Sequence, residues 1–180
     1  MHSKPLAIAA PENSEHAPYY ARYISLVEST DILDTLADQP HETVSLLSRF
    51  TEDHGDDRYQ PEKWSVKEVL GHVIDTERIF AYRALRIARN DKTPIEGFEQ
   101  DDYVPYGLFG RRSLNDLIEE FNCVRHASLL LFRNLDADAW SRRGIASENE
   151  VSVRAIAYII AGHELHHRKI LKEKYLPLAA

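Results

Sequence analysis

Apolar residues recur every three or four positions in four segments of the chain, a spacing that predicts four helices. The first segment spans 31–50, and Pro40 within it predicts a kink or a break. The second spans 65–90 and opens on a capping box, in which Ser65 is followed three residues later by Glu68. The residues expected to face the core from this second helix are Val66, Val69, Leu70, Val73, Phe80, Ala84 and Ile87.

Serine caps also mark the third and fourth helices. Ser113 precedes the third helix, and Ser152 precedes the fourth, which is expected to end near Tyr175. The expected core face of the third helix consists of Leu114, Leu117, Phe121, Leu131 and Leu135. A polar turn, 136–149, separates the two helices, and no segment alternates convincingly as a strand would. Four long helices with short or crossing connections predict an all-α four-helix bundle.

The connection between the second and third helices is long and rich in aromatic residues. It spans 91–112 and contains Phe98, Tyr103 and Tyr106. A connection of this length in a compact domain is typically functional or crosses the fold. We therefore expect these rings to help shape a substrate pocket. Trp64, just before the second helix, is expected either to pack as a hydrophobic staple or to form a pocket wall.

Composition narrows the class of protein. Of the 180 residues, 43% are hydrophobic and 28% charged, so we expect one folded bundle domain, over 19–180. Residues 1–18 have no helical pattern, and we expect them to form an extended or poorly ordered arm. The net charge of −7, without a stripe of Lys and Arg, argues against a nucleic-acid partner. No apolar run has the length of a membrane span, and the lone Cys123, expected on the outer side of its helix, fits a reducing compartment. These features favour a cytoplasmic protein.

Two histidines of the fourth helix lie on its apolar stripe. At about 100° per residue, Ile156 and Ile170 flank His163 at about 20°, and His167 lies about 40° from it, whereas His166 lies at the margin. Residues four apart on a helix have Cβ atoms roughly 5–6 Å from each other, close enough to share one ion. Buried imidazoles cost free energy unless their nitrogens are satisfied. The pair is therefore a candidate for metal ligation, the alternative being hydrogen-bonded core histidines.

A third ligand must come from another helix, and His72 is the well-placed histidine. It lies on the border of its helix's apolar stripe, a position that suits either a ligand near an open pocket or a solvated side chain. His126 is expected to point to solvent. The remaining histidines, in the arm or beside loops, are not candidates: His2, His16, His41 and His54.

Two motifs resemble those of the DinB-like superfamily, in the same order. The segment 61–72, PEKWSVKEVLGH, resembles the family's first ligand motif, and 161–167, AGHELHH, resembles its last-helix motif. The likeness runs from about residue 23 to 176 and implies an up-down-down-up four-helix bundle, usually a homodimer. It also implies ligand roles for His72, His163 and His167, and none for His166.

The resemblance implies a metal site more firmly than it implies a reaction. Family members include metal-dependent thiol S-transferases that use bacillithiol, mycothiol or glutathione, and some relatives have been described as metal-dependent hydrolases. Three neutral imidazoles leave a divalent ion an open coordination position, where a thiol is deprotonated or the pKa of water falls toward about 7. Zinc or nickel fits such a site. We expect thiol transfer to a small electrophile, the alternatives being hydrolysis or a non-catalytic metal-binding protein.

The string His163-Glu164-x-x-His167 also matches the HExxH motif of zinc proteases. A protease of this kind needs a third ligand downstream, and the residues after His167 contain neither His nor Asp. This alternative is therefore the least favoured of those considered. Weak candidates for a general acid or base are Glu164, Asp75 and Glu77, although solvated helix carboxylates are commoner.

The outer face of the fourth helix is apolar as well. It carries Tyr158, Ala161, Gly162 and Leu165, and small residues allow another helix to approach closely. We therefore predict a homodimer contact on this face.

Overall fold

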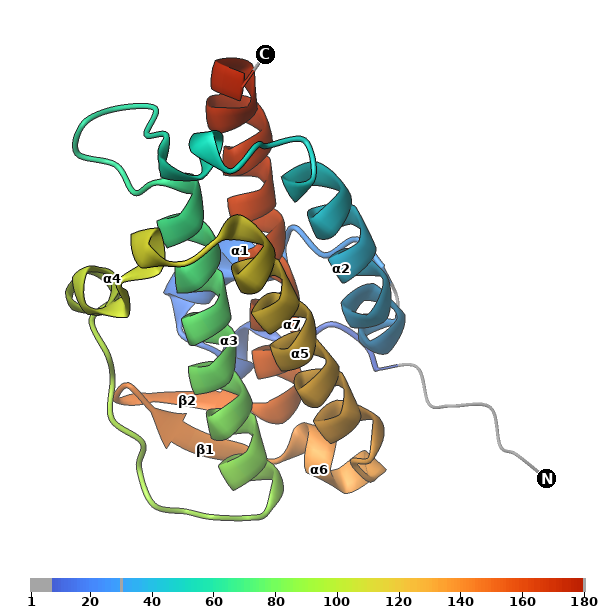
Figure 1. Ribbon diagram of the computed structural model, residues 1–180. Helices are drawn as coiled ribbons and strands as arrows, with labels where there is room; N and C mark the ends of the chain where they lie inside the picture. Colours follow the sequence, from blue (N-terminus) through green and yellow to red (C-terminus); the bar gives the residue numbers. More distant parts are fainter. Residues whose placement is uncertain (1–7, 30, 180) are drawn as a thin grey trace.

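The computed structural model describes residues 8–29 and 31–179 (Figure 1). Its long helices are α2 (Ile32–Leu47), α3 (Val66–Ala88), α5 (Leu114–Arg133) and α7 (Val153–Ile170). The shorter helices and the strands are α1 (Ala21–Ile24), α4 (Gln100–Gly107), α6 (Ala137–Ser141), β1 (Arg143–Ala146) and β2 (Asn149–Ser152). Single turns complete it: η1 (Asn13–Glu15), η2 (Pro18–Tyr20), η3 (Asp53–Asp56), η4 (Phe109–Arg111), η5 (Leu171–Tyr175, a π turn) and η6 (Leu176–Ala179).

The four long helices form a bundle with up-down-down-up topology, as predicted (Figure 1). Helices α3 and α5 run in the same direction, because the connector between them returns along the whole length of the bundle. Helix α3 packs against α5 and α7, and α2 packs against the same two helices. No helix among the described residues is long and apolar enough to cross a membrane.

Local sequence signals explain where the helices begin. The Ser65 hydroxyl accepts the backbone N–H of Glu68 at 3.2 Å, and the Glu68 carboxylate accepts that of Ser65 at 2.7 Å, which is the predicted capping box. The hydroxyls of Ser113 and Ser152 accept the backbone N–H groups of Asp116 and Ala155 and so cap α5 and α7. All residues predicted to face the core from α3 are buried, so that helix is confirmed along its length.

Helix α2 continues through Pro40, so the predicted break is wrong. Proline has no N–H to donate to the carbonyl four residues earlier, which leaves the carbonyl of Leu36 free. The guanidinium of Arg125, from α5, lies 3.5 Å from this oxygen and donates to it. A neighbouring helix thus replaces the hydrogen bond that Pro40 cannot make.

The buried face of α5 differs from the prediction. Leu131 and Leu135 are half-buried, whereas Phe132 is fully buried and Arg125 is 1% exposed. The buried stripe continues from Phe121 to Arg125 at a spacing of four. Because Arg125 is polar, the apolar pattern alone does not include it. The prediction therefore chose Leu131 and Leu135, which are only half-buried.

Several short elements were not predicted, among them a helix in the connector and a hairpin before α7. The connector contains the short helix α4, and residues 143–152 form an antiparallel hairpin in which Arg143 pairs with Ser152 and Ala146 with Asn149. Ile95 of the connector forms a parallel bridge to Ala146, so the connector is joined to the hairpin. The hairpin is a small addition to an otherwise helical fold.

The described part of the N-terminal arm, 8–18, packs against the bundle rather than standing free, and residues 1–7 lie outside the described part. Ile8 is buried, and its carbonyl accepts a hydrogen bond from the Tyr158 hydroxyl at 3.0 Å. Glu15 is 2% exposed and pairs with Arg154. Single buried residues in a patternless segment give no periodic signal in the sequence.

The predicted dimer contact on α7 is wrong, because the chain itself covers that face. Helix α1 packs against α7, and a Cβ placed on Gly162 would lie 2.0 Å from the carbonyl oxygen of Tyr23. Tyr158 and Ala161 are buried, and Leu165 is half-buried. The small residues therefore allow α1 of the same chain to pack closely against α7.

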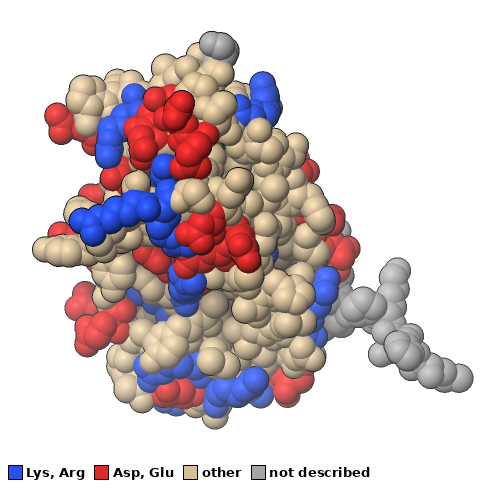
Figure 2. Space-filling model, in the orientation of Figure 1, with Lys and Arg blue, Asp and Glu red and all other residues tan. Residues whose placement is uncertain are grey.

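Figure 2 shows acidic and basic side chains interspersed over one face of the molecule. On this face the Lys and Arg side chains form no continuous stripe. The distribution agrees with the acidic net charge of −7.

Candidate metal centre

Three histidines from two helices meet inside the bundle. His72 comes from the second turn of α3, and His163 and His167 come from consecutive turns of α7. Their side chains are 3%, 6% and 8% exposed. The Nε2 atom of His163 lies 3.0 Å from that of His72 and 3.1 Å from that of His167. The structure thus brings together the three histidines singled out from the sequence.

Hydrogen bonds among the imidazoles cannot satisfy this arrangement. A neutral imidazole has one N–H and one lone pair, on different ring nitrogens. The Nε2 of His163 can therefore donate one hydrogen bond or accept one, but it has two Nε2 neighbours. Protonating the rings would place like charges in contact. A cation that takes all three Nε2 lone pairs satisfies these three nitrogens at once.

The donor set also fits a transition metal in its dimensions. Zinc binds imidazole nitrogen at about 2.0–2.1 Å, so tetrahedral ligands lie roughly 3.3 Å from one another. The ligand atoms here all lie within 4.8 Å of one another, and two of the separations are 3.0 and 3.1 Å. His72, His163 and His167 are therefore a candidate three-histidine metal site.

The environment keeps the imidazoles neutral, which is the form that binds a metal. Burial, with a smaller contribution from His166, lowers the pKa of His72 to about 4. Burial also lowers the pKa values of His163 and His167 well below the usual value for histidine, and the neighbouring histidines lower them further. All three side chains thus offer lone pairs at neutral pH.

Aromatic and hydroxyl groups surround the cluster. The Trp64 ring lies 4.7 Å from the His72 ring, and the Tyr23 ring lies 5.3 Å from the His163 ring. The Thr76 hydroxyl lies 3.4 Å from Nδ1 of His72, which positions that ring. His166 is half-buried, packs on Tyr23 and lies outside the cluster.

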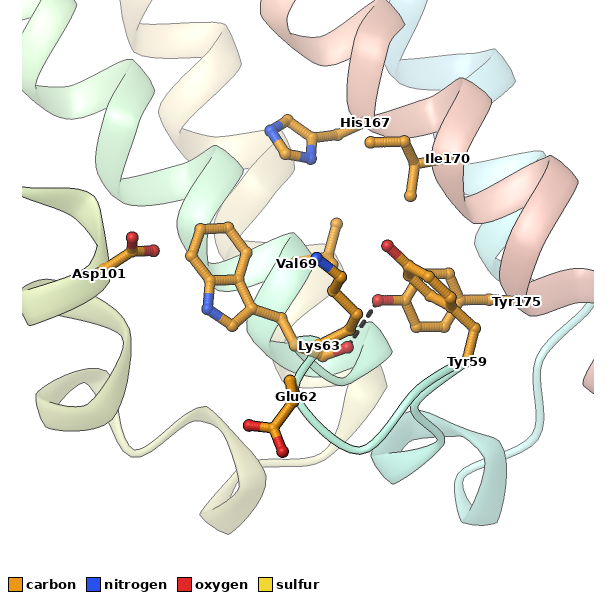
Figure 3. A pocket seen from close by; sticks show the side chains of 9 residues that line it. Tyr59, Glu62, Lys63, Val69, Asp101, His167, Ile170 and Tyr175 are labelled. Carbon is orange, nitrogen blue, oxygen red and sulfur yellow. Dashed lines mark hydrogen bonds between the residues drawn. The ribbon is translucent and has the colours of Figure 1, made fainter.

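A cavity of about 500 Å³ reaches the cluster at His167. Its lining consists of Tyr59, Glu62, Lys63, Trp64, Val69, Asp101, His167, Ile170 and Tyr175. Figure 3 shows His167 and Ile170 on the opposite side of this cavity from Glu62, with Asp101 across from Tyr175. The Tyr175 hydroxyl donates to the carbonyl of Trp64 at 2.5 Å, which ties the loop before α3 to η5, the turn that follows α7.

A second cavity, of about 350 Å³, reaches the cluster at His163. Its lining consists of Tyr19, Tyr20, Tyr23, Thr76, Phe80, Phe98, Glu99, Gln100, Ser147, Ile159 and His163. The two cavities share no lining residue, so the histidines stand between two separate spaces.

A family model described as the DinB superfamily matches residues 35–171. The chain belongs to the DinB superfamily. Its fold is similar to that of YfiT from Bacillus subtilis, described as a probable metal-dependent hydrolase with an unusual four-helix bundle topology. The two are 14% identical with a TM-score of 0.74, over 93% of this chain and 92% of YfiT.

The fold is also similar to that of the mycothiol-dependent maleylpyruvate isomerase. The identity is 13% and the TM-score 0.67, over 81% of this chain and 61% of the isomerase, so this chain matches less than two thirds of that protein. At these identities, the likeness shows a shared fold alone. No curated protein sequence matches the chain.

The aromatic residues singled out from the sequence are divided among three places in this DinB bundle. Trp64 lines the cavity at His167, and Phe98 lines the cavity at His163. Tyr103 and Tyr106 line a separate hollow and are 47% and 86% exposed. Asp75 lines that same hollow. Trp64 and Phe98 are thus the two of the four that the structure brings beside the histidines.

The three carboxylates considered as acids or bases are engaged elsewhere. Glu164 accepts a hydrogen bond from Thr43 at 2.5 Å and forms an ion pair with Arg125 at 2.7 Å. Glu77 forms hydrogen bonds with the same guanidinium at 2.9 and 2.8 Å. Asp75 is half-buried, 3.7 Å from Arg78, and burial raises its pKa. Glu164 therefore does not serve as the base of a protease motif here.

Sequence reasoning missed Arg125, which is central to the interior of this DinB protein. Its guanidinium contacts Glu77, Glu164 and the side-chain oxygen of Gln39. Its position, four residues after the buried Phe121, was the available signal, and the charge of the side chain concealed it. Tyr23 and Tyr59 were also missed, because both reach the cavities from segments without a strong periodic pattern.

Proposed function

We propose that this DinB protein is a metal-dependent enzyme that transfers a small thiol to an electrophilic compound. One observation carries the proposal: three buried, neutral imidazoles direct their Nε2 atoms at a common point. His72, His163 and His167 would hold one divalent ion, zinc or nickel.

When bound by three neutral imidazoles, such an ion supplies Lewis acidity and an open coordination position at which a thiol loses its proton. This chemistry needs no general base from the protein. Glu77 and Glu164, the buried carboxylates closest in sequence to the histidines, are both bound to Arg125. Because Arg125 occupies both of these buried carboxylates, neither is free to act as the base of a hydrolysis, and thiol activation is favoured.

The two cavities support a reaction of two substrates. One reaches His167 past Trp64 and Lys63, and the other reaches His163 past Tyr23 and Phe98. The aromatic walls keep water from the histidines and hold the two compounds on opposite sides of them. A thiol in one cavity and an electrophile in the other would meet at the cluster.

The same three histidines fit a metal-dependent hydrolase, the description given to YfiT, and hydrolysis is the second candidate. A homodimer and a cytoplasmic location remain part of the proposal, since family resemblance and composition support them. The homodimer proposal does not use the outer face of α7, because α1 of the same chain packs there.

The first experiment is elemental analysis of the purified protein and of single variants. We expect close to one zinc or nickel per chain in the wild type, and loss of it in His72→Ala and His163→Ala. His166→Ala is the matched control, because His166 is on the same helix but outside the cluster, and it should retain the metal. Full retention of metal in His72→Ala and His163→Ala would disprove the site.

A metal-loaded protein then permits a test of the reaction. Glutathione, bacillithiol and mycothiol are each offered with a panel of small electrophiles, and loss of the free thiol is measured. Turnover by the wild type that is absent in His163→Ala supports thiol transfer. Thiol-independent cleavage of ester or amide substrates would instead select the hydrolase, and inactivity in both screens would favour a non-catalytic metal-binding protein.

A further inference from the structure

Arg83 carries a positive charge into the interior without an acidic partner. Its side chain is 2% exposed, and no ion pair in the described part of the chain includes it. The other deeply buried arginine, Arg125, differs in having two carboxylates beside its guanidinium. A buried charge without a counter-charge is costly, so the surroundings of Arg83 call for an explanation.

The hydrogen-bond partners and rings that Arg83 contacts among the described residues are neutral. Its guanidinium donates to the carbonyl of Glu96 at 3.1 Å and to the hydroxyl of Ser147 at 2.8 Å. It also lies 5.0 Å from the Phe80 ring and 5.7 Å from the Phe98 ring. Its Nε atom is buried without a partner among the described residues. The positive charge is solvated by dipoles and rings but is not neutralised.

Three of these neighbours line the cavity that ends at His163. They are Phe80, Phe98 and Ser147, so Arg83 lies directly behind one wall of that cavity. The remaining rings in the lining come from Tyr19, Tyr20 and Tyr23. Glu99 is the carboxylate in the lining, and its side chain is exposed to solvent. The cavity therefore combines aromatic walls, a histidine and an uncompensated cation behind Ser147.

The backbone of Ser147 is held in an unusual conformation at this wall. Its φ is 51° and that of Glu148 is 62°, the left-handed values of a two-residue hairpin turn that normally favours Asn and Gly. The Ser147 N–H donates to the carbonyl of Ile95 at 2.9 Å, which fixes the turn against the connector. Because the Ser147 oxygen accepts from Arg83, its hydroxyl proton is free to be donated into the cavity.

We propose that the cavity beside His163 binds a small organic carboxylate with a flat, apolar body. The Ser147 hydroxyl donates to the carboxylate, the charge of Arg83 supplies the missing counter-charge, and the aromatic walls pack on the body of the ligand. The inference rests on the proposed function only in identifying this carboxylate as the electrophilic substrate. Binding itself needs Ser147 and Arg83 and does not need the metal.

The test compares two ligands of one shape, 2-naphthoate and its neutral amide, 2-naphthamide, in calorimetric titrations. We expect the wild type to bind the carboxylate at least tenfold more tightly than the amide. Arg83→Met and Ser147→Gly should each reduce this preference at least fivefold. Ser147→Gly also relieves the left-handed backbone strain, so it keeps the test valid if Arg83→Met fails to fold.

Two control variants locate the bound anion. Arg89→Met removes the charge of an exposed arginine at the C-terminal end of the same helix, and the preference should persist. Lys63→Met removes the cation that lines the other cavity, and the preference should again persist. Loss of the preference in Lys63→Met, with retention in Arg83→Met, would place the anion in the other cavity and overturn the inference.

The His72→Ala variant separates this inference from the proposed function. Preference for the carboxylate in that variant supports a site built by Ser147 and Arg83. If the preference exists in the metal-loaded wild type but disappears in His72→Ala, the metal rather than the protein holds the carboxylate, and the inference is wrong. If the wild type binds no metal and still prefers the carboxylate, the inference about the anion site holds. The proposed enzymatic function is then wrong.

Discussion

Arg125 forms hydrogen bonds with both carboxylate oxygens of Glu77, at 2.9 and 2.8 Å, in the interior of the bundle. Its remaining side lies 2.7 Å from Glu164. Glu77 is on α3, which carries His72, and Glu164 is on α7 between His163 and His167. One side chain of α5 therefore joins the two helices that supply the metal ligands.

Removing Arg125 alone should be severely destabilising. In Arg125→Met two buried carboxylates lose their partner, and we expect the free energy of unfolding to fall by about 3–5 kcal/mol. The variant Glu77→Gln/Arg125→Met/Glu164→Gln removes all three charges together, and it should recover at least half of that loss. The free energies of unfolding of both variants are measured by urea denaturation. A loss below about 1 kcal/mol in the single variant would show that the ion pairs contribute little.

The residues that sequence reasoning found are those with local signals. The Ser65 and Glu68 capping box and the regular apolar stripe placed α3 correctly, because both depend on neighbours three or four positions away. His163 and His167 were found in the same way, as two histidines four apart on an apolar stripe. The choice of His72 needed the family resemblance, since no local pattern distinguishes a ligand from a solvated histidine.

The features that were missed depend on contacts between distant segments. Arg125 belongs to the core only because Glu77 and Glu164 come to it from two other helices. The covering of Gly162 depends on α1, which lies far from it in the sequence. An apolar outer face on a helix indicates that something covers it, but it does not indicate whether the cover is a second copy or the same chain.

Substitution of Gly162 tests this covering. A Cβ at this position would lie 2.0 Å from the carbonyl oxygen of Tyr23, so the backbone of α1 must move in Gly162→Ala. We expect the free energy of unfolding to fall by about 1–3 kcal/mol, with no change in oligomeric state. Gly110→Ala is the control, because the nearest atom to its Cβ, from Asp56, would be 3.6 Å away. If Gly162→Ala changed the sedimentation coefficient without lowering the stability, this face would be a dimer interface after all.

The arm should contribute a pH-dependent part of the stability through Glu15. Burial alone raises the pKa of Glu15, but hydrogen bonds from Arg154 and Ser152 outweigh that effect, and the pKa falls from 4.5 to about 2. The stabilising contribution is therefore fully present above pH 4.5 and is lost as the pH falls toward 2. A shift of this size corresponds to about 3 kcal/mol.

The measurement is the difference in unfolding free energy between the wild type and Glu15→Gln. We expect the wild type to be more stable by about 2–3 kcal/mol at neutral pH, and this difference to shrink to about half near pH 3. Glu28→Gln, at an exposed position, should show no such difference at either pH. A difference that grows as the pH falls would mean that the pKa of Glu15 is raised rather than lowered.

Removal of the metal should leave the fold in place. The described core consists of two apolar clusters, one around Ile156 and Phe132 and the other around Leu70 and Phe121, and neither is built on the histidines. A chelator should therefore leave the helical circular dichroism at 25 °C unchanged. The Tm should fall by about 5–10 °C, because an ion at a hundred times its Kd stabilises a chain of this size by about 2.7 kcal/mol.

His72→Ala provides the matched control, since a chain that holds no metal should have the same Tm with and without the chelator. A chelator-dependent change in that variant would indicate an effect unrelated to the histidine site. Collapse of the helical signal when the wild type is chelated would show that the ion is structural. The bundle would then depend on the metal for folding, and the proposal that the three histidines form an open, reactive site would have to be abandoned.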